Sequence, residues 1–275
     1  MKTRIITGIV AIALFVPVCI FSNYIVFPIV MAILSVIGAY EMAKCLKQEK
    51  KYALTIPMYI VAALLPISRF FFVRQARFFA FAMIVVFFML IYALAYVMLR
   101  KNKDNLSEVL TLYALFVYIV GCFSSIVCVR YMPNGKYLYL LIFLGAWVCD
   151  TFAYFTGRFF GKHKLIPEIS PKKTVEGSIG GIVFTVASFA LYGLILDLGW
   201  DVQISYVLLL ITGLIASVVS QIGDLVASSV KRQYNLKDYG NLFPGHGGVL
   251  DRFDSVMLTA PTLVILNLVM GYFNV

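Results

Sequence analysis

The sequence predicts an all-α integral membrane protein, a polytopic bundle of about nine transmembrane helices. Hydrophobic residues make up 62% of the 275 residues and charged residues only 13%, which exceeds the apolar share of a soluble domain. The apolar residues gather in runs of about 20, a length that crosses a bilayer as a helix. Because unpaired backbone groups cannot face hydrocarbon, we expect these runs to be helices rather than open sheet.

The first run follows Lys2 and Arg4, and the next run begins before any small-residue cleavage site. We therefore interpret it as a retained span and not as a signal peptide. The polar connections are too short for a separate domain, so one membrane-embedded unit is expected, with residues 1–135 as scaffold helices and residues 136–275 carrying the site. The predicted spans are 5–21, 24–43, 52–68, 78–99, 109–129, 137–156, 177–196, 202–223 and 255–273.

The distribution of cationic residues predicts the orientation. With the N-terminus in the cytoplasm, the inner loops hold 18 of the 23 Lys and Arg residues, as the positive-inside rule requires. This predicts a multi-pass protein of the cell (inner) membrane with its charged segments facing the cytoplasm. These loops also explain the net charge of +10, so the expected partners are anionic lipid and phosphate ligands and not nucleic acid.

Four aspartates converge on the predicted inner side. Asp150 and Asp224 lie near the inner ends of the sixth and eighth spans, and Asp251 and Asp254 lie where the ninth span begins. Acids at the start of a helix can simply complement its dipole. Two acids beside His246, a neighbouring arginine and a Gly-Gly turn favour a working site instead.

One face of the eighth span is polar. Residues spaced i, i+3, i+7 and i+10 share a helical face, and an aspartate beside lipid costs up to ~3 kcal/mol. This face is therefore expected to look into the bundle or a water-filled cavity. The residues on it are Gln221, Asp224, Ser228 and Lys231.

Carboxylates that converge with Lys and Arg indicate a phosphate–magnesium site, since Mg²⁺ takes hard oxygen ligands and shares the rest with phosphate and water. The run Pro244–Gly248 offers backbone N–H groups that can approach a phosphate closely. Lys172 and Lys173, just ahead of the seventh span, could hold phosphate at a helix N-terminus. A topological role is the alternative, and the neighbouring Ser170, Thr174 and Glu176 favour phosphate binding over it. The spacing G-x-x-x-G at 157–161 is also compatible with helix packing alone.

Three segments carry a resemblance to a known family. The run Ser228–Asp254 contains S-x-V-K-R, then K-D-x-G, then P-x-H-G-G-V-x-D-R-F-D. Together with Trp147–Lys162 and Ser170–Gly177, it resembles the phosphatidate cytidylyltransferase (CDP-diacylglycerol synthase) family. The resemblance covers roughly residues 140–260, and the N-terminal half agrees only in being hydrophobic helices.

The resemblance implies a reaction of phospholipid biosynthesis, in which CTP and phosphatidic acid give CDP-diacylglycerol and pyrophosphate. The lipid phosphate would attack the α-phosphorus of CTP in line, assisted by Mg²⁺ and a candidate second cation. Metal ligands would be Asp224, Asp251 and Asp254, with Asp150 as a candidate fourth. Catalytic roles would fall to Lys231, Arg232, Lys237, Asp238, His246 and Arg252, and substrate contacts to Ser170, Lys172, Lys173, Thr174, Glu176, Ser228, Gly247 and Gly248.

Four other classes of function are compatible with parts of the sequence. A CTP-dependent lipid kinase would transfer the γ-phosphate and release CDP. A CDP-alcohol transferase would be expected to carry an Asp-Gly-x-x-Ala-Arg signature, which the sequence does not contain. An ion-coupled transporter would be expected to contain inverted repeats, with broken helices in corresponding halves. The polar residues are instead concentrated at the inner ends of the last four spans. A purely structural membrane protein leaves the charge cluster unexplained. A homodimer is compatible with such a bundle.

Overall fold

The computed structural model describes residues 13, 15–100, 104–200, 202–270 and 273–274. Within these ranges, seven helical segments are long and apolar enough to cross a membrane, and one further apolar helix, α11 (Val256–Met270), is shorter. The prediction of an all-α polytopic membrane protein is confirmed, and eight of the nine predicted spans have a matching helix. Most of the first predicted span, 5–21, lies outside the described residues, as do Lys2, Arg4, Lys101 and Lys103.

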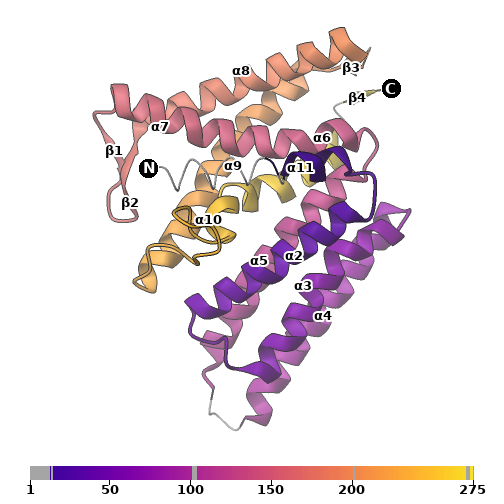
Figure 1. Ribbon diagram of the computed structural model, residues 1–275, viewed down its shortest axis with the longest axis vertical. Helices are drawn as coiled ribbons and strands as arrows, with labels where there is room; N and C mark the ends of the chain where they lie inside the picture. Colours follow the sequence, from indigo (N-terminus) through magenta and orange to yellow (C-terminus); the bar gives the residue numbers. More distant parts are fainter. Residues whose placement is uncertain (1–12, 14, 101–103, 201, 271–272, 275) are drawn as a thin grey trace. The chain divides into compact units, whose positions relative to one another are not determined.

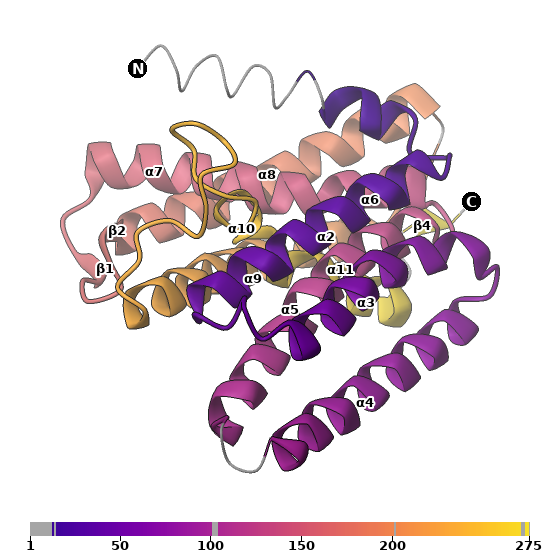
Figure 2. The ribbon, with the colours of Figure 1, turned by 60° about the horizontal axis from the view of Figure 1, so that its bottom comes forward.

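The chain divides into two compact units, and the first contains residues 1–131 and 234–252. In this unit α3 and α5 both lie against α2, and α4 lies against α3 and α5 (Figures 1 and 2). The outward face of α4 is apolar, with Met83, Phe88 and Met98 exposed, as expected for a helix that faces lipid. The helices of this unit are α2 (Val26–Cys45), α3 (Tyr52–Phe71), α4 (Gln75–Leu99), α5 (Leu106–Arg130) and the start of the short α10 (Leu250–Phe253).

Charged side chains tie the helix ends of the first unit together. Lys51, just before α3, forms an ion pair of 2.8 Å with Asp104, just before α5. Arg100 at the end of α4 reaches the same carboxylate at 3.2 Å. At other helix ends, the buried Arg69 guanidinium donates to the backbone carbonyl of Tyr131 at 2.8 Å. Loops at these helix ends are thus fixed by ionic and hydrogen bonds as well as by packing.

The second unit contains residues 132–233 and 253–275. Helix α8 lies along α7 and also against α9, and α11 lies against α9; Figure 1 shows α7 and α8 side by side. The apolar span Gly135–Phe160 is built from three helical pieces. The helices are α6 (Gly135–Phe143), the π-helical turn η1 (Leu144–Val148), α7 (Cys149–Phe160), α8 (Val175–Trp200), α9 (Tyr206–Gln233) and α11.

Two small antiparallel sheets supplement the helices of the second unit. Strands β1 (Lys164–Ile166) and β2 (Ser170–Thr174) form a hairpin between α7 and α8, and β3 (Gln203–Ile204) pairs with β4 (Phe273–Asn274). The sequence analysis did not predict these strands. The β1–β2 hairpin matters for the site because β2 runs directly into α8.

Small residues let α7 and α8 approach closely. A Cβ atom added to Gly177 would lie 2.6 Å from the Ala153 backbone oxygen, and one added to Gly157 would lie 2.7 Å from Oγ1 of Thr174, the residue before α8, and 3.5 Å from the Gly177 Cα. The distances of 2.6 and 2.7 Å are shorter than van der Waals contact. The glycines at 157 and 177 therefore serve helix packing in the structure, which supports the packing interpretation of the G-x-x-x-G spacing.

Candidate functional site

In the second unit, charged side chains from separate chain segments meet. Lys173, near the end of β2, forms an ion pair through Nζ with Oδ2 of Asp224 on α9. Ser228, one turn further along α9, donates from Oγ to Oδ1 of the same carboxylate at 3.4 Å. A lysine that precedes α8 and an aspartate from the next helix are thus held together, as the predicted convergence of polar groups requires.

Asp254, in the turn between α10 and α11, belongs to the same cluster. Burial raises the pKa of the Asp254 carboxyl well above its ordinary value, and the negative charges of Asp224 and Asp150 raise it further. The charge of Lys231 acts in the opposite direction. Three carboxylates from α7, α9 and the α10–α11 turn therefore repel one another, and this arrangement favours the binding of a cation.

The polar face of α9 turns away from the exterior. Gln221 and Lys231 are buried, whereas Ile222 and Val226 on the opposite side are exposed. The i, i+3, i+7, i+10 spacing predicted this orientation, and the burial confirms it. Lys231 is held inside the protein rather than on its surface, so its charge acts at short range on the carboxylates.

The turn η1 directly precedes Asp150. Gly145 within it lies so close to α9 that an added Cβ would be 3.1 Å from the Ala216 Cβ. A π-helical turn changes the direction of the side chains that follow it and occurs often at functional sites. Here it sets the rotation of α7, and Asp150 lies in the first turn of that helix.

The segment that carries Lys172 and Lys173 is braced at the start of α8. Thr174 accepts the backbone N–H of Gly177 through Oγ1 at 3.1 Å, the usual cap of a helix N-terminus. The Glu176 carboxylate accepts the backbone N–H of Lys162 at 3.1 Å and contacts His163 Nδ1 at 2.6 Å. Thr174 and Glu176 therefore fix the hairpin, Lys173 reaches Asp224, and Lys172 is exposed.

The glycine-rich part of the signature folds in the first unit around Asp251. Oδ2 of this buried aspartate accepts the backbone N–H groups of Tyr239 at 2.7 Å and Gly248 at 3.0 Å. Gly247 has φ +84°, a conformation that side chains disfavour, and an added Cβ there would lie 2.7 Å from Asp251 Oδ2. The glycines are needed so that the loop can close over this carboxylate.

A second carboxylate from a distant helix holds the same loop. Glu41 of α2 accepts the N–H of Val249 through Oε1 and of Leu250 through Oε2, both at 2.9 Å. Its side chain is 4% exposed. The sequence analysis treated α2 as scaffold and missed this residue. The available signal was an acid inside an apolar run, which is rare in a membrane helix and usually functional.

The predicted site residues thus fall into two groups, one in each unit. In the first unit, Asp251 is buried, His246 is half-buried, and Lys237, Asp238 and Arg252 are exposed. Each group is internally ordered, and within the signature the chain connects them at residues 233–234 and at residues 252–253. The second-unit group consists of Asp150, Ser170, Lys172, Lys173, Thr174, Glu176, Asp224, Ser228, Lys231, Arg232 and Asp254, and the first-unit group of Lys237, Asp238, His246, Gly247, Gly248, Asp251 and Arg252.

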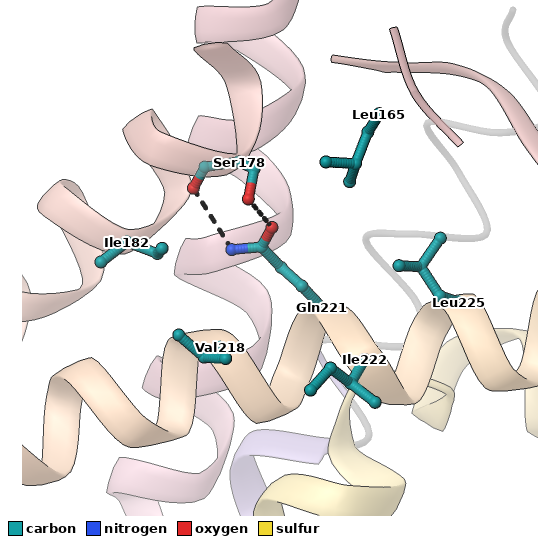
Figure 3. A pocket seen from close by; sticks show the side chains of 7 residues that line it. All are labelled: Leu165, Ser178, Ile182, Val218, Gln221, Ile222 and Leu225. Atoms are coloured by element: carbon teal, nitrogen blue, oxygen red, sulfur yellow. Dashed lines mark hydrogen bonds between the residues drawn. The ribbon is translucent and has the colours of Figure 1, made fainter. Parts of the chain in front are cut away.

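A cavity of about 160 Å³ lies between β1, α8 and α9. Figure 3 shows that its polar lining groups face each other: Ser178 Oγ donates to Gln221 Oε1, and Gln221 Nε2 donates to the Ser178 carbonyl at 3.2 Å. The remaining lining residues are aliphatic: Leu165, Ile182, Val218, Ile222 and Leu225. The Ser178 and Gln221 side chains are thus hydrogen-bonded to each other within this cavity.

The aspartates of the second-unit cluster are the candidate ligands for a metal ion. Among the described residues, no three His, Cys, Asp or Glu side chains already surround a common point as metal ligands. The donor chemistry nevertheless fits magnesium, since all candidate ligands are carboxylate oxygens. The ammonium group of Lys173 forms an ion pair with Asp224, so positive charge already lies beside this carboxylate.

Comparison with known proteins identifies the family. The model of the cytidylyltransferase family matches residues 2–270, well beyond the 140–260 region that carried the resemblance. A phosphatidate cytidylyltransferase of Bacillus subtilis (strain 168) is 36% identical over 97% of both chains. A protein of the same name from Staphylococcus saprophyticus is 35% identical over 97% of this chain and 98% of its own. The chain is therefore a membrane-embedded nucleotidyltransferase and belongs to the cytidylyltransferase family.

Proposed function

We propose that the protein transfers the cytidylyl group of CTP to phosphatidic acid, giving CDP-diacylglycerol and pyrophosphate. The observation that carries the proposal is similarity over 97% of the chain to relatives named phosphatidate cytidylyltransferase. The charged cluster of the second unit supports it, because both substrates are anions and their approach requires neutralisation of charge.

In the proposed reaction, a phosphate oxygen of phosphatidic acid attacks the α-phosphorus of CTP. A new P–O bond forms there, and the bond between the α-phosphorus and the bridging oxygen to the β-phosphorus breaks, so that pyrophosphate leaves on the opposite side. The attacking phosphate is already ionised at neutral pH, so no side chain is needed to remove a proton. The protein's task is to position the two anions and offset their repulsion.

We assign the cationic side chains to the phosphates. Lys173 and Lys231 lie in the cluster with Asp224 and Asp254, where an ammonium group can pair with either a carboxylate or a substrate phosphate. Lys237, Arg232 and Arg252 are exposed and suited to the triphosphate arriving from water. His246 lies in the glycine-rich turn, where its ring can donate to the departing pyrophosphate.

The proposed metal ligands of the second unit are Asp150, Asp224 and Asp254, and Asp251 of the first unit stays a predicted ligand. A bound Mg²⁺ would supply positive charge to the phosphoryl oxygens. Asp251 also accepts two backbone hydrogen bonds, and through them it stabilises the conformation of the glycine-rich loop. We further propose that the site faces the cytoplasm, where the positive-inside distribution puts the basic loops and where CTP is available.

The position of the label in the product tests this function. Purified protein is incubated with phosphatidic acid, Mg²⁺ and CTP labelled either at the α- or at the γ-phosphorus. Cytidylyl transfer predicts that only the α-label enters the lipid, while the γ-label appears in pyrophosphate. Entry of the γ-label into the lipid, with release of CDP, would instead establish a lipid kinase and contradict the proposal.

A further inference from the structure

We propose that Glu41 is a positioning residue for the signature loop, and that it acts on cytidylyl transfer through residues 247–252. The inference rests on the function proposed above and adds a residue from α2, in the half of the chain that the sequence analysis treated as scaffold. The contacts that carry it all lie within the first unit.

Both oxygens of the Glu41 carboxylate are used, each by one N–H group at the end of the loop. Oε1 accepts from Val249 and Oε2 from Leu250, each at 2.9 Å. Val249 and Leu250 are themselves fully buried. A carboxylate that accepts two successive backbone donors fixes the orientation of that peptide segment, because charge-assisted bonds are the stronger ones.

At two glycines of the signature, the backbone lies directly against the Glu41 carboxylate. An added Cβ on Gly240 would lie 2.5 Å from Glu41 Oε1, and one on Gly248 would lie 2.5 Å from the Glu41 carboxyl carbon. One turn earlier on the same face of α2, an added Cβ on Gly38 would lie 2.9 Å from Leu250. The loop therefore closes on α2 at positions where a side chain would collide.

The fixed segment carries reactive groups directly. Leu250 is followed by Asp251 and Arg252, and Val249 is preceded by the turn that contains His246. Asp251 closes the other side of the turn by accepting the N–H of Gly248. Because small displacements of catalytic groups reduce turnover strongly, loss of the Glu41 contacts is expected to lower kcat more than substrate binding.

The test compares Glu41→Gln with a matched variant, Glu108→Gln, in the full-length detergent-solubilised protein. Glutamine keeps the shape of Glu41 but turns an NH₂ group toward one of the two N–H donors. We expect kcat to fall between about 10-fold and 100-fold with KM for CTP changed less than about threefold. Glu108 is exposed and lies on α5 of the same unit, so its variant should keep the wild-type kcat.

Hydrogen exchange provides a readout that does not depend on activity. In Glu41→Gln, amides in residues 239–252 should exchange faster by about tenfold, while those of α5 remain unchanged. Unchanged exchange in residues 239–252 would overturn the contact, and faster exchange with wild-type kcat would overturn its role in catalysis. If wild-type protein fails to transfer the cytidylyl group, the proposed function is wrong, and the exchange result still decides whether Glu41 holds the loop.

Glycine substitutions test the same contact if Glu41→Gln does not fold. Gly240→Ala should displace the Glu41 carboxylate and reproduce the faster exchange of residues 239–252. Gly121→Ala on α5 is the matched control, because an added Cβ there meets no heavy atom of the described residues within 4 Å. Equal exchange and equal kcat in the two alanine variants would contradict the proposal.

Discussion

Lys173 is in direct contact with an acid of the second-unit cluster. Its ammonium group pairs with Asp224, although its position in the sequence, ahead of an apolar span, also allowed a topological role. The neighbouring Lys172 points elsewhere and is exposed. Two adjacent lysines on a strand face opposite sides, which explains why only one of them reaches α9.

Removal of the Lys173 charge should impair cytidylyl transfer. For Lys173→Met we expect kcat/KM to fall roughly 10- to 100-fold, the range of a lost charge-assisted contact to a phosphate or carboxylate. Lys164→Met is the matched control, since Lys164 lies exposed on the paired strand of the same hairpin. Steady-state kinetics with CTP as the varied substrate make the comparison, and equal losses in both variants would assign the effect to the hairpin as a whole.

Some residues of the candidate site could be predicted from the sequence, and one could not. The spacing on α9 was sufficient to place Asp224 and Lys231 on an inward face. Glu41 could not be connected to the signature, because its hydrogen-bond partner Val249 lies 208 residues away along the chain. Such a pairing depends on tertiary packing, and a single sequence carries no periodic signal for it.

At the scale of elements, helix α8 depends on glycine for its contact with α7. Gly177→Ala would bring a Cβ within 2.6 Å of the Ala153 backbone oxygen, and backbone cannot move away as a flexible side chain can. We expect a loss of about 1–3 kcal/mol in the free energy of unfolding.

Gly199→Ala is the control for this prediction, because it lies on the same helix and its added Cβ meets no described heavy atom within 4 Å. Alanine there should be neutral or stabilising by up to about 1 kcal/mol. Thermal unfolding of both variants in detergent provides the measurement. A Gly177→Ala protein as stable as Gly199→Ala would show that α7 and α8 are not held at the distance described.

The apolar runs predicted elements well where length and hydrophobicity decide the structure. The run 24–43 became α2, Val26–Cys45, and the run 177–196 became part of α8, Val175–Trp200. The hairpin of β1 and β2 was not predicted, because strands of three and five residues are too short for an alternating pattern. The π-helical turn η1 was missed for a similar reason, since its hydrophobic residues continue the run on either side.

At the scale of the whole molecule, ionic bonds between loops make stability depend on pH. The hydrogen bond from Lys51 lowers the pKa of the Asp104 carboxyl below its ordinary value, and Arg100 contributes in the same direction. A lowered pKa in the folded state means that the stabilisation is present above the ordinary aspartate pKa of about 4 and is lost as the pH falls through the folded-state value.

Asp104→Asn should therefore destabilise the protein near pH 7 by roughly 0.2–1 kcal/mol, the usual range for a pair that water reaches. The difference from wild type should shrink as the pH falls below about 4. Thermal unfolding of wild type, Asp104→Asn, Lys51→Met and the double variant measures it. Additive effects of the two substitutions at pH 7 would contradict a direct pair.

The two units hold different parts of the candidate site. The first unit orders the glycine-rich loop through Asp251 and Glu41, and the second gathers Lys173, Asp224 and Asp254 into a charged cluster. Within the signature itself the chain passes from the second unit to the first between residues 233 and 234, and back between residues 252 and 253. This continuity explains why the signature could be recognised as one motif although its side chains are ordered by separate sets of helices.

The most direct test of the second-unit cluster as the reaction centre is cytidylyl transfer by Asp224→Asn beside Asp197→Asn. Both aspartates lie on apolar helices of the same unit, but Asp197 accepts from Tyr206 away from the cluster, at 3.1 Å. We predict that Asp224→Asn loses roughly 100-fold or more of kcat, as removal of a group that stabilises transition-state charge does, while Asp197→Asn stays within about twofold. An Asp224→Asn protein as active as Asp197→Asn would contradict the assignment.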